Sequence, residues 1–205
     1  MLKNSTTKFH RLSDEKRQRI LEASISEFSE KGYEAASMNK VVESAGISKG
    51  SLFNYFRTKS SLFLYVYHLA LQQVKAYLRD VRDRTKDDPF FDRLQQIMYA
   101  GVEFIQGHPH LAKIYFHLLY TSDAPRSREI LNQIRQLSAD YLTEIIQQGI
   151  QRGEVNPRLK LEQAVFIIDS SLNQFLHHYH VSRSRIDVRE WINGLMSVIR
   201  KGLAP

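Results

Sequence analysis

The chain has 205 residues, of which 42% are hydrophobic, so it can bury a packed core and fold as an ordinary soluble protein. Because it contains no cysteine, disulfides, thiolate nucleophiles and cysteine-ligated zinc are excluded. The 29 lysine and arginine residues outnumber the 22 aspartate and glutamate residues and give a net charge of +7, which favours a polyanionic partner when the excess is clustered.

The sequence predicts neither a membrane span nor a secretion signal. Its longest mostly apolar stretch, Leu62 to Leu71, is about half of the roughly 20 residues that a span requires. The basic N-terminus runs into charged residues instead of an apolar block. We therefore expect a cytoplasmic protein with no membrane partner.

Helical periodicity runs through the chain, and glycine or proline interrupts it at intervals. Ser13 is expected to cap the first helix, and Gly32 to end it in the left-handed conformation. Thr58 is expected to cap a longer helix, and Asp123-Ala124-Pro125 to separate two later ones. The pattern predicts an all-α chain of about nine helices, over residues 14–31, 38–45, 49–56, 59–84, 89–106, 109–120, 125–151, 160–180 and 187–202.

Two of these helices are short and flank a tight turn. The first follows Ser37, Gly46 breaks the chain, and the next begins at Lys49 with Ser48 as its N-cap. This arrangement is typical of a helix-turn-helix, whose second helix enters the major groove of DNA. We expect a DNA-binding domain with a basic N-terminal tail and a larger helical domain, over residues 1–58 and 59–205.

The segment from Met38 to Lys59, MNKVVESAGISKGSLFNYFRTK, closely resembles the DNA-binding signature of the TetR (tetracycline-repressor-like) family. Upstream, ILEAS at 20–24 and FSEKGY at 28–33 are similar to the family's first helix and its exit, so the resemblance covers about residues 14–65. It implies a homodimeric transcriptional regulator, by default a repressor, whose C-terminal helices bind a small effector.

Candidate DNA contacts lie in and around the second short helix. Lys49 is placed to reach a guanine edge or a phosphate, Ser51 to bond to either, and Asn54 to pair with an adenine edge through its amide. Lys59 matches the family's phosphate-binding lysine. The candidate DNA-binding residues are Ser37, Ser48, Lys49, Gly50, Ser51, Phe53, Asn54, Tyr55 and Lys59.

The chain departs from the family at Phe53, where many members have tyrosine. A phenyl ring cannot donate a hydrogen bond to phosphate, and Tyr55 is the candidate to compensate. The basic tail, which includes Lys3 and Lys8, either lies along phosphates, enters the minor groove or remains solvated.

The C-terminal part carries no matching motif, so its role follows from the resemblance. Its aromatic residues are consistent with an apolar pocket, although core packing is the better explanation for each of them. The last two helices have apolar faces broad enough for a dimer bundle, which would match a palindromic operator. The candidate pocket residues are Tyr99, Phe104, Tyr115, Phe116, His117, Tyr120, Phe166 and Asn173.

Two other classes of function remain alternatives. A histidine-metal enzyme is disfavoured by spacing, and the chain has no phosphate-binding loop, dinucleotide fingerprint or serine elbow, so no cofactor is expected. A helical scaffold would bind another protein through the apolar C-terminal faces. The effector, the operator and the regulated genes are not specified by the sequence. The histidines considered as metal ligands are His108, His110, His117, His177, His178 and His180.

Overall fold

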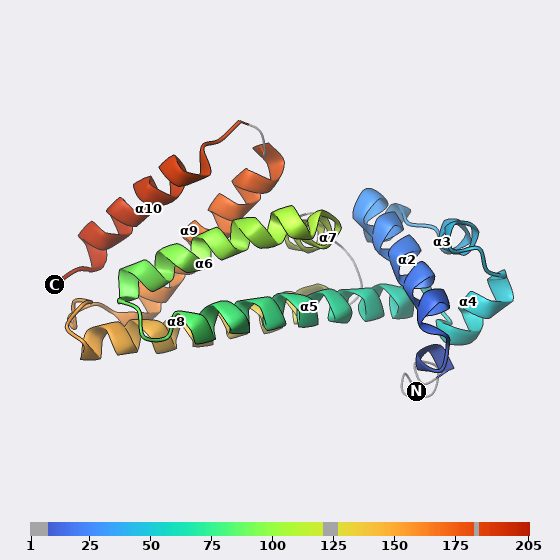
Figure 1. Ribbon diagram of the computed structural model, residues 1–205, viewed down its shortest axis with the longest axis horizontal. Helices are drawn as coiled ribbons and strands as arrows, with labels where there is room; N and C mark the ends of the chain where they lie inside the picture. Colours follow the sequence, from blue (N-terminus) through green and yellow to red (C-terminus); the bar gives the residue numbers. More distant parts are fainter. Residues whose placement is uncertain (1–7, 121–126, 183–184) are drawn as a thin grey trace. The chain divides into compact units, whose positions relative to one another are not determined.

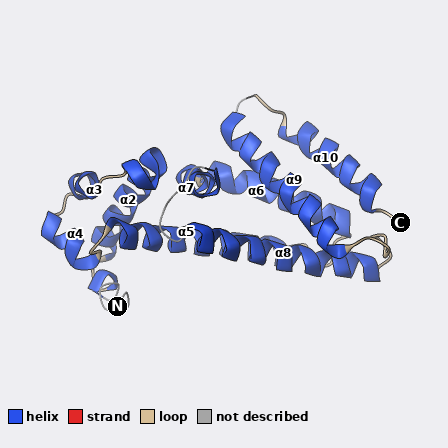
Figure 2. Cartoon of the chain, turned by 180° about the vertical axis from the view of Figure 1, so that it is seen from behind, coloured by secondary structure: helices blue, strands red, loops and turns tan. Residues whose placement is uncertain are grey.

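The computed structural model describes residues 8–120, 127–182 and 185–205. Within these ranges the regular elements are all helices, which confirms the all-α prediction (Figures 1 and 2). The helices are α2 (Asp14–Ala35), α3 (Met38–Ala45), α4 (Lys49–Tyr55), α5 (Lys59–Arg84), α6 (Phe90–Gly107), α7 (Pro109–Tyr120), α8 (Ser127–Gln151), α9 (Leu161–Ser182) and α10 (Val188–Leu203). The expected break at Asp123-Ala124-Pro125 lies outside the described residues.

Short polar side chains fix the beginnings of several helices. The hydroxyl of Ser13 accepts a hydrogen bond from the backbone N–H of Lys16 at the start of α2, as predicted. Thr58 accepts one from the N–H of Ser61 at the start of α5, over 3.1 Å. Each bond satisfies an N–H group that has no partner within its own helix, so these starts are encoded locally.

Gly32 was expected to end the first helix in the left-handed conformation; the regular helix does break there, but the predicted conformation is wrong. The residue does have a positive φ of 67°, but its ψ is −176°, far from the left-handed helical value. The chain kinks there and helical structure resumes as far as Ala35. A left-handed glycine cap would have required ψ near +47°.

The chain divides into two compact units, which are described separately. Unit 1 comprises residues 1–74 and 108–127, and unit 2 comprises residues 75–107 and 128–205. Helix α5 contributes its first part to unit 1 and its last part to unit 2. The predicted domain boundary between residues 58 and 59 stays a prediction.

The core of unit 1 forms where α2 packs against α3 and α7. Val41, Ala45, Leu52 and Phe56 are buried, and Ile47 is half-buried. These side chains hold α3 and α4 at a fixed angle and leave the opposite side of α4 available. Other large buried side chains of the unit are Phe9, Ile20, Phe28 and Leu62.

Unit 2 packs α6 against α9 and α10 around buried aliphatic side chains. Its interior also contains Arg93 of α6, which is only 3% exposed. The guanidinium donates to Gln148 Oε1 over 2.8 Å and lies 5.6 Å from the ring centre of Tyr141, both on α8. Gln148 in turn donates to the carboxylate of Glu144 over 3.2 Å, so a carboxylate lies one hydrogen bond beyond the guanidinium.

Candidate DNA-binding site

The turn between α3 and α4 is built as predicted. Gly46 has φ 61° and ψ 43°, the left-handed conformation that glycine adopts without steric cost. Its N–H bonds to Glu43 O, and the N–H of Ile47 bonds to Val42 O, so the last carbonyl groups of α3 are satisfied. The turn therefore ends one helix and lets the next begin within three residues.

The start of α3 is held by a residue that the sequence analysis did not single out. Ser37 precedes α3 as expected, but its side chain makes no capping hydrogen bond. Its backbone N–H instead donates to the carboxylate of Glu27 on α2, over 2.8 Å. Glu27 thus ties the helix-turn-helix to the first helix.

The tip of α4 is free of bulk and exposed. Ser48, Lys49 and Gly50 are all exposed, and Asn54 is exposed one turn later. Ser48 caps the helix by accepting the N–H of Ser51, and the two hydroxyl oxygens lie 2.9 Å apart. This local chemistry leaves the N-terminal end of α4 presented to solvent, which is the end that helix-turn-helix proteins use to read base edges.

Gly50 can test whether the tip of α4 approaches DNA closely. A Cβ atom placed there would meet nothing within 4 Å in the protein itself. Alanine is therefore expected to stabilise the free protein by about 0.5–1 kcal/mol, and its methyl group to weaken operator binding roughly tenfold by keeping the helix from the groove. Thermal unfolding and duplex titration measure the two effects. Gly107→Ala, at another open position, is the control that should leave binding alone. Unchanged affinity in Gly50→Ala would contradict close approach.

The aromatic pair of α4 divides between the surface and the core. Phe53 is half-buried and its ring centre lies 5.8 Å from the ammonium of Lys49, a cation–π contact. Tyr55 is only 9% exposed, and its ring packs 6.0 Å from that of Phe9. The structure thus places the Tyr55 ring in the core of unit 1, and its predicted phosphate contact stays a prediction.

Lys59 at the start of α5 is already bonded within the protein. Its ammonium donates to the backbone carbonyls of Glu34 and Ala36, over 2.8 and 3.3 Å, and lies 4.8 Å from the ring centre of Tyr33. It therefore holds the C-terminal end of α2, where cations are favoured. A phosphate contact by the same side chain stays a prediction.

The described residues just before α2, 8–13, contact the rest of unit 1. Lys8 donates a hydrogen bond to the amide oxygen of Asn54 over 3.2 Å, and the next residue, Phe9, has no exposed surface. The Phe9 ring packs against Phe56 and Tyr65, with ring centres 5.0 and 5.3 Å apart. Burial raises the pKa of the Tyr65 phenol, which keeps it neutral. Lys3 lies outside the described residues.

The eight candidate pocket residues are distributed over both units. On α7 of unit 1, Phe116 is buried and its ring stacks on that of the exposed Tyr120. In unit 2, the half-buried Phe104 packs against Tyr77, whereas Phe166 is 71% exposed. The remaining four are half-buried, namely Tyr99, Tyr115, His117 and Asn173.

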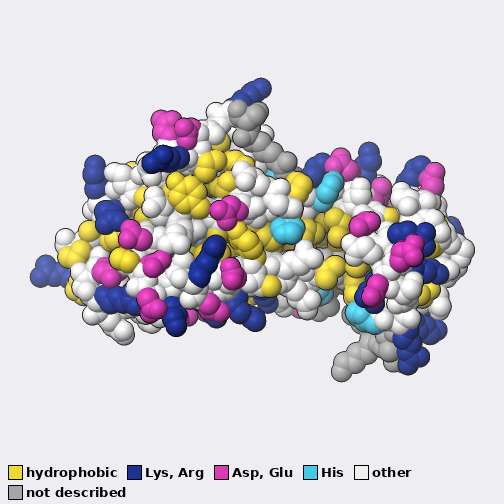
Figure 3. Space-filling view, in the orientation of Figure 1, with side chains coloured by type: hydrophobic (Ala, Val, Ile, Leu, Met, Phe, Trp, Pro, Cys, Tyr) yellow, Lys and Arg dark blue, Asp and Glu magenta, His cyan; other side chains and the backbone are white. Residues whose placement is uncertain are grey.

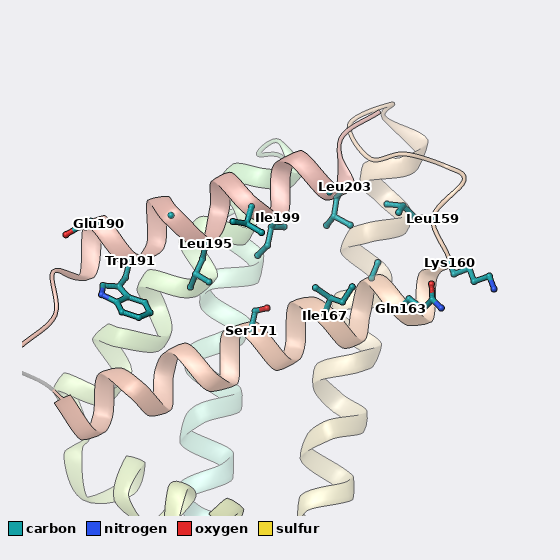
Figure 4. A pocket seen from close by; sticks show the side chains of 14 residues that line it. Leu159, Lys160, Gln163, Ile167, Ser171, Glu190, Trp191, Leu195, Ile199 and Leu203 are labelled. Atoms are coloured by element: carbon teal, nitrogen blue, oxygen red, sulfur yellow. The ribbon is translucent and has the colours of Figure 1, made fainter.

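A cavity of about 680 Å³ opens between α9 and α10 of unit 2, and none of the eight candidate residues lines it (Figure 4). Trp191, Leu195 and Ile199 of α10 point towards Ile167 and Ser171 of α9 across this groove. In Figure 3, hydrophobic side chains also reach the surface in the region of these helices. The lining is mainly apolar, so the groove suits hydrophobic side chains better than a charged molecule.

The described residues form neither a metal site nor a membrane span. No group of three or more histidine, aspartate or glutamate residues there is close enough to hold a metal ion. His110 instead pairs with the buried hydroxyl of Ser29 over 2.9 Å, and the ring of His178 lies 4.7 Å from that of Trp191. No described helix is both long and apolar enough to cross a membrane.

Comparison with known proteins agrees with this geometry. Residues 20–66 match the family model of bacterial regulatory proteins of the TetR family, and residues 88–203 match the tetracyclin repressor-like C-terminal domain. The HTH-type transcriptional regulator YhgD of Bacillus subtilis is 24% identical, with 94% of this chain and 99% of that protein covered.

Solved structures show the same fold. A TetR family transcriptional regulator from Chloroflexus aurantiacus has a TM-score of 0.78 and 27% identity, with 98% of both chains covered. FadR from Bacillus subtilis, in complex with stearoyl-CoA, has a TM-score of 0.73 and 19% identity, covering 90% of this chain and 98% of that one. The chain therefore belongs to the TetR family of bacterial regulatory proteins, and it is a DNA-binding transcriptional regulator, not an enzyme.

Proposed function

We propose that the protein is a repressor that binds a palindromic operator as a homodimer and is released by a small apolar or amphipathic effector. The observation that carries this proposal is the division of α4 into two sides. Leu52 and Tyr55 are buried, while Lys49, Gly50 and Asn54 are exposed together. A helical scaffold that does not bind DNA does not require an exposed lysine and glycine at the start of this helix.

The proposed DNA contacts follow from the chemistry of each exposed group. Lys49 and Asn54 reach base edges, and Ser51 supports them through its hydroxyl. The flanking groups position the helix on the backbone through phosphate contacts, which carry no sequence information. The proposed backbone contacts are Ser37, Ser48, Phe53, Tyr55 and Lys59, with Phe53 contributing apolar contact only.

The proposed dimer interface is the face formed by α9 and α10. Val198 is 71% exposed and Ile167 and Trp191 are also exposed, and all three line the groove between the helices. Contiguous apolar surface of this kind marks an interaction site in a soluble protein. A second copy supplies a matching apolar face, and its two-fold symmetry presents two reading helices to the two halves of a palindrome.

Val198→Glu is expected to shift the protein from dimer to monomer, because it places a charge in a desolvated interface. Sedimentation of the full chain over a range of concentrations measures this shift. Leu137→Glu is the matched control: Leu137 is an exposed apolar residue of α8 in the same unit. A Val198→Glu protein that stays dimeric would place the interface elsewhere.

The effector class rests on similarity alone. FadR of Bacillus subtilis was solved with stearoyl-CoA, which combines a long apolar chain with a polar head. An effector of this chemistry releases this regulator from DNA only if it binds the DNA-free conformation more tightly, and by thermodynamic linkage DNA then weakens effector binding equally. We also propose that the protein acts in the cytoplasm, where its operator lies.

The experiment that tests the proposal is recovery and footprinting of genomic fragments bound by the purified protein at roughly physiological salt. We expect a protected palindrome whose binding weakens steeply as salt rises, since phosphate contacts release counterions. Fragments recovered without any sequence preference would refute an operator-binding repressor. They would favour the alternative of a helical scaffold whose α9–α10 face binds another protein.

A further inference from the structure

The segment before α2 is fixed against the helix-turn-helix. The backbone N–H groups of Arg11 and Leu12 bond to the carbonyls of Lys8 and Phe9, over 3.3 and 3.2 Å, and close a turn. The Phe9 ring has no exposed surface and anchors this turn in the core of unit 1. The backbone of Lys8 therefore has a defined position beside α4, on which Asn54 lies.

The hydrogen bond between Lys8 and Asn54 fixes the polarity of the amide. An ammonium group can only donate, so the atom 3.2 Å from Lys8 Nζ must be the amide oxygen of Asn54 and not its nitrogen. The amide nitrogen remains as the free end of the side chain. Both residues are exposed, and Asn54 is on the reading helix.

This polarity decides which base edge the pair can match. Adenine offers one acceptor and one donor in the major groove, and an asparagine pairs with it only if its amide oxygen is available. Guanine offers two acceptors, N7 and O6. The Asn54 oxygen keeps a second lone pair, but the Lys8 ammonium 3.2 Å away places positive charge and further N–H donors beside it. The pair therefore presents mainly donors, which the two acceptors of guanine match better than the acceptor and donor of adenine.

We propose that Lys8 sets the base preference of Asn54, so that the two side chains together select guanine instead of the adenine that an isolated asparagine selects. The inference rests on the proposed function, because it requires that α4 reads an operator. Lys8 thereby becomes a specificity-determining residue supplied from outside the helix-turn-helix.

The test is selection of bound duplexes from a random library by the wild-type chain and three variants. Lys8→Met removes the ammonium but keeps most of the stem, and Asn54→Ala removes the amide. Arg11→Met is the matched control, because it removes a charge from the same turn but leaves the Lys8–Asn54 bond in place. Affinities for duplexes that differ at one base pair are then measured at constant salt.

We expect the wild type to prefer guanine about tenfold at one position of each half-site. Asn54→Ala should lose this preference, and Lys8→Met should change it to adenine because the amide oxygen is released. Arg11→Met should weaken all sequences equally and reduce the salt dependence by about one phosphate contact.

Three results would overturn the inference. The first is a wild type that already prefers adenine at the position that Asn54→Ala affects. Alternatively, Lys8→Met would weaken all duplexes equally without changing any preference, which would make Lys8 a phosphate contact. Finally, a wild type that enriches no sequence would refute the proposed function itself, and the inference with it.

Discussion

Replacing Phe9 by alanine is expected to lower the free energy of unfolding of unit 1 by about 3–5 kcal/mol, the usual cost of deleting a fully buried aromatic ring. Phe9 has no exposed surface and packs against Tyr55, Phe56 and Tyr65. Its removal leaves a cavity beneath the reading helix. Denaturant titration followed by the helical circular dichroism signal measures the loss.

The chain provides two internal controls for this measurement. Trp191 is its only tryptophan and lies in unit 2, so the tryptophan fluorescence transition should move less than the helical signal. His10→Ala changes the adjacent, exposed ring and should cost no more than about 0.5 kcal/mol. A loss below about 1 kcal/mol in Phe9→Ala would mean that the segment is not anchored in solution.

The double variant Lys49→Ala, Asn54→Ala is expected to lower affinity for the selected operator at least a hundredfold, since each good base contact contributes about 1–3 kcal/mol. Binding to a scrambled duplex should fall far less, because phosphate contacts supply most non-specific affinity. Titration of both duplexes at one salt concentration gives the ratio of operator affinity to scrambled-duplex affinity.

The matched control for this variant is Lys75→Ala, Asn132→Ala, which removes the same two residue types from exposed positions on α5 and α8. Operator affinity should be nearly unchanged in the control. An equal loss for operator and scrambled duplex in the Lys49, Asn54 variant would assign both residues to the phosphate backbone instead of the bases.

The helix boundaries were predictable because their signals are local. The caps at Ser13, Ser48 and Thr58 act within three residues of the helix that they begin. Gly46 supplies a conformation that other residues adopt only at a cost of about 1–2 kcal/mol. The conformation of Gly32 was predicted wrongly because glycine adopts a positive φ in kinks as well as in helix caps. The ψ angle distinguishes the two, and the residue type does not determine it.

The features that the sequence did not predict depend on contacts distant in the chain. The bond from Lys8 to Asn54 spans 46 residues, and no periodic pattern relates the two. A lone phenylalanine in a basic tail carries no periodic signal, although Phe9 proves to be part of the core. The α9–α10 groove depends on which faces of two helices meet, which apolar content alone leaves undetermined.

The buried guanidinium of Arg93 has a consequence for heat tolerance. Burying a charged guanidinium removes it from water, and this desolvation opposes folding. That cost falls as temperature rises, because hydration of the exposed charge in the unfolded chain becomes less favourable. An Arg93→Met protein should therefore be more stable at 25 °C, and its advantage should shrink on warming. The buried charge therefore makes the free energy of unfolding fall less steeply as the temperature rises.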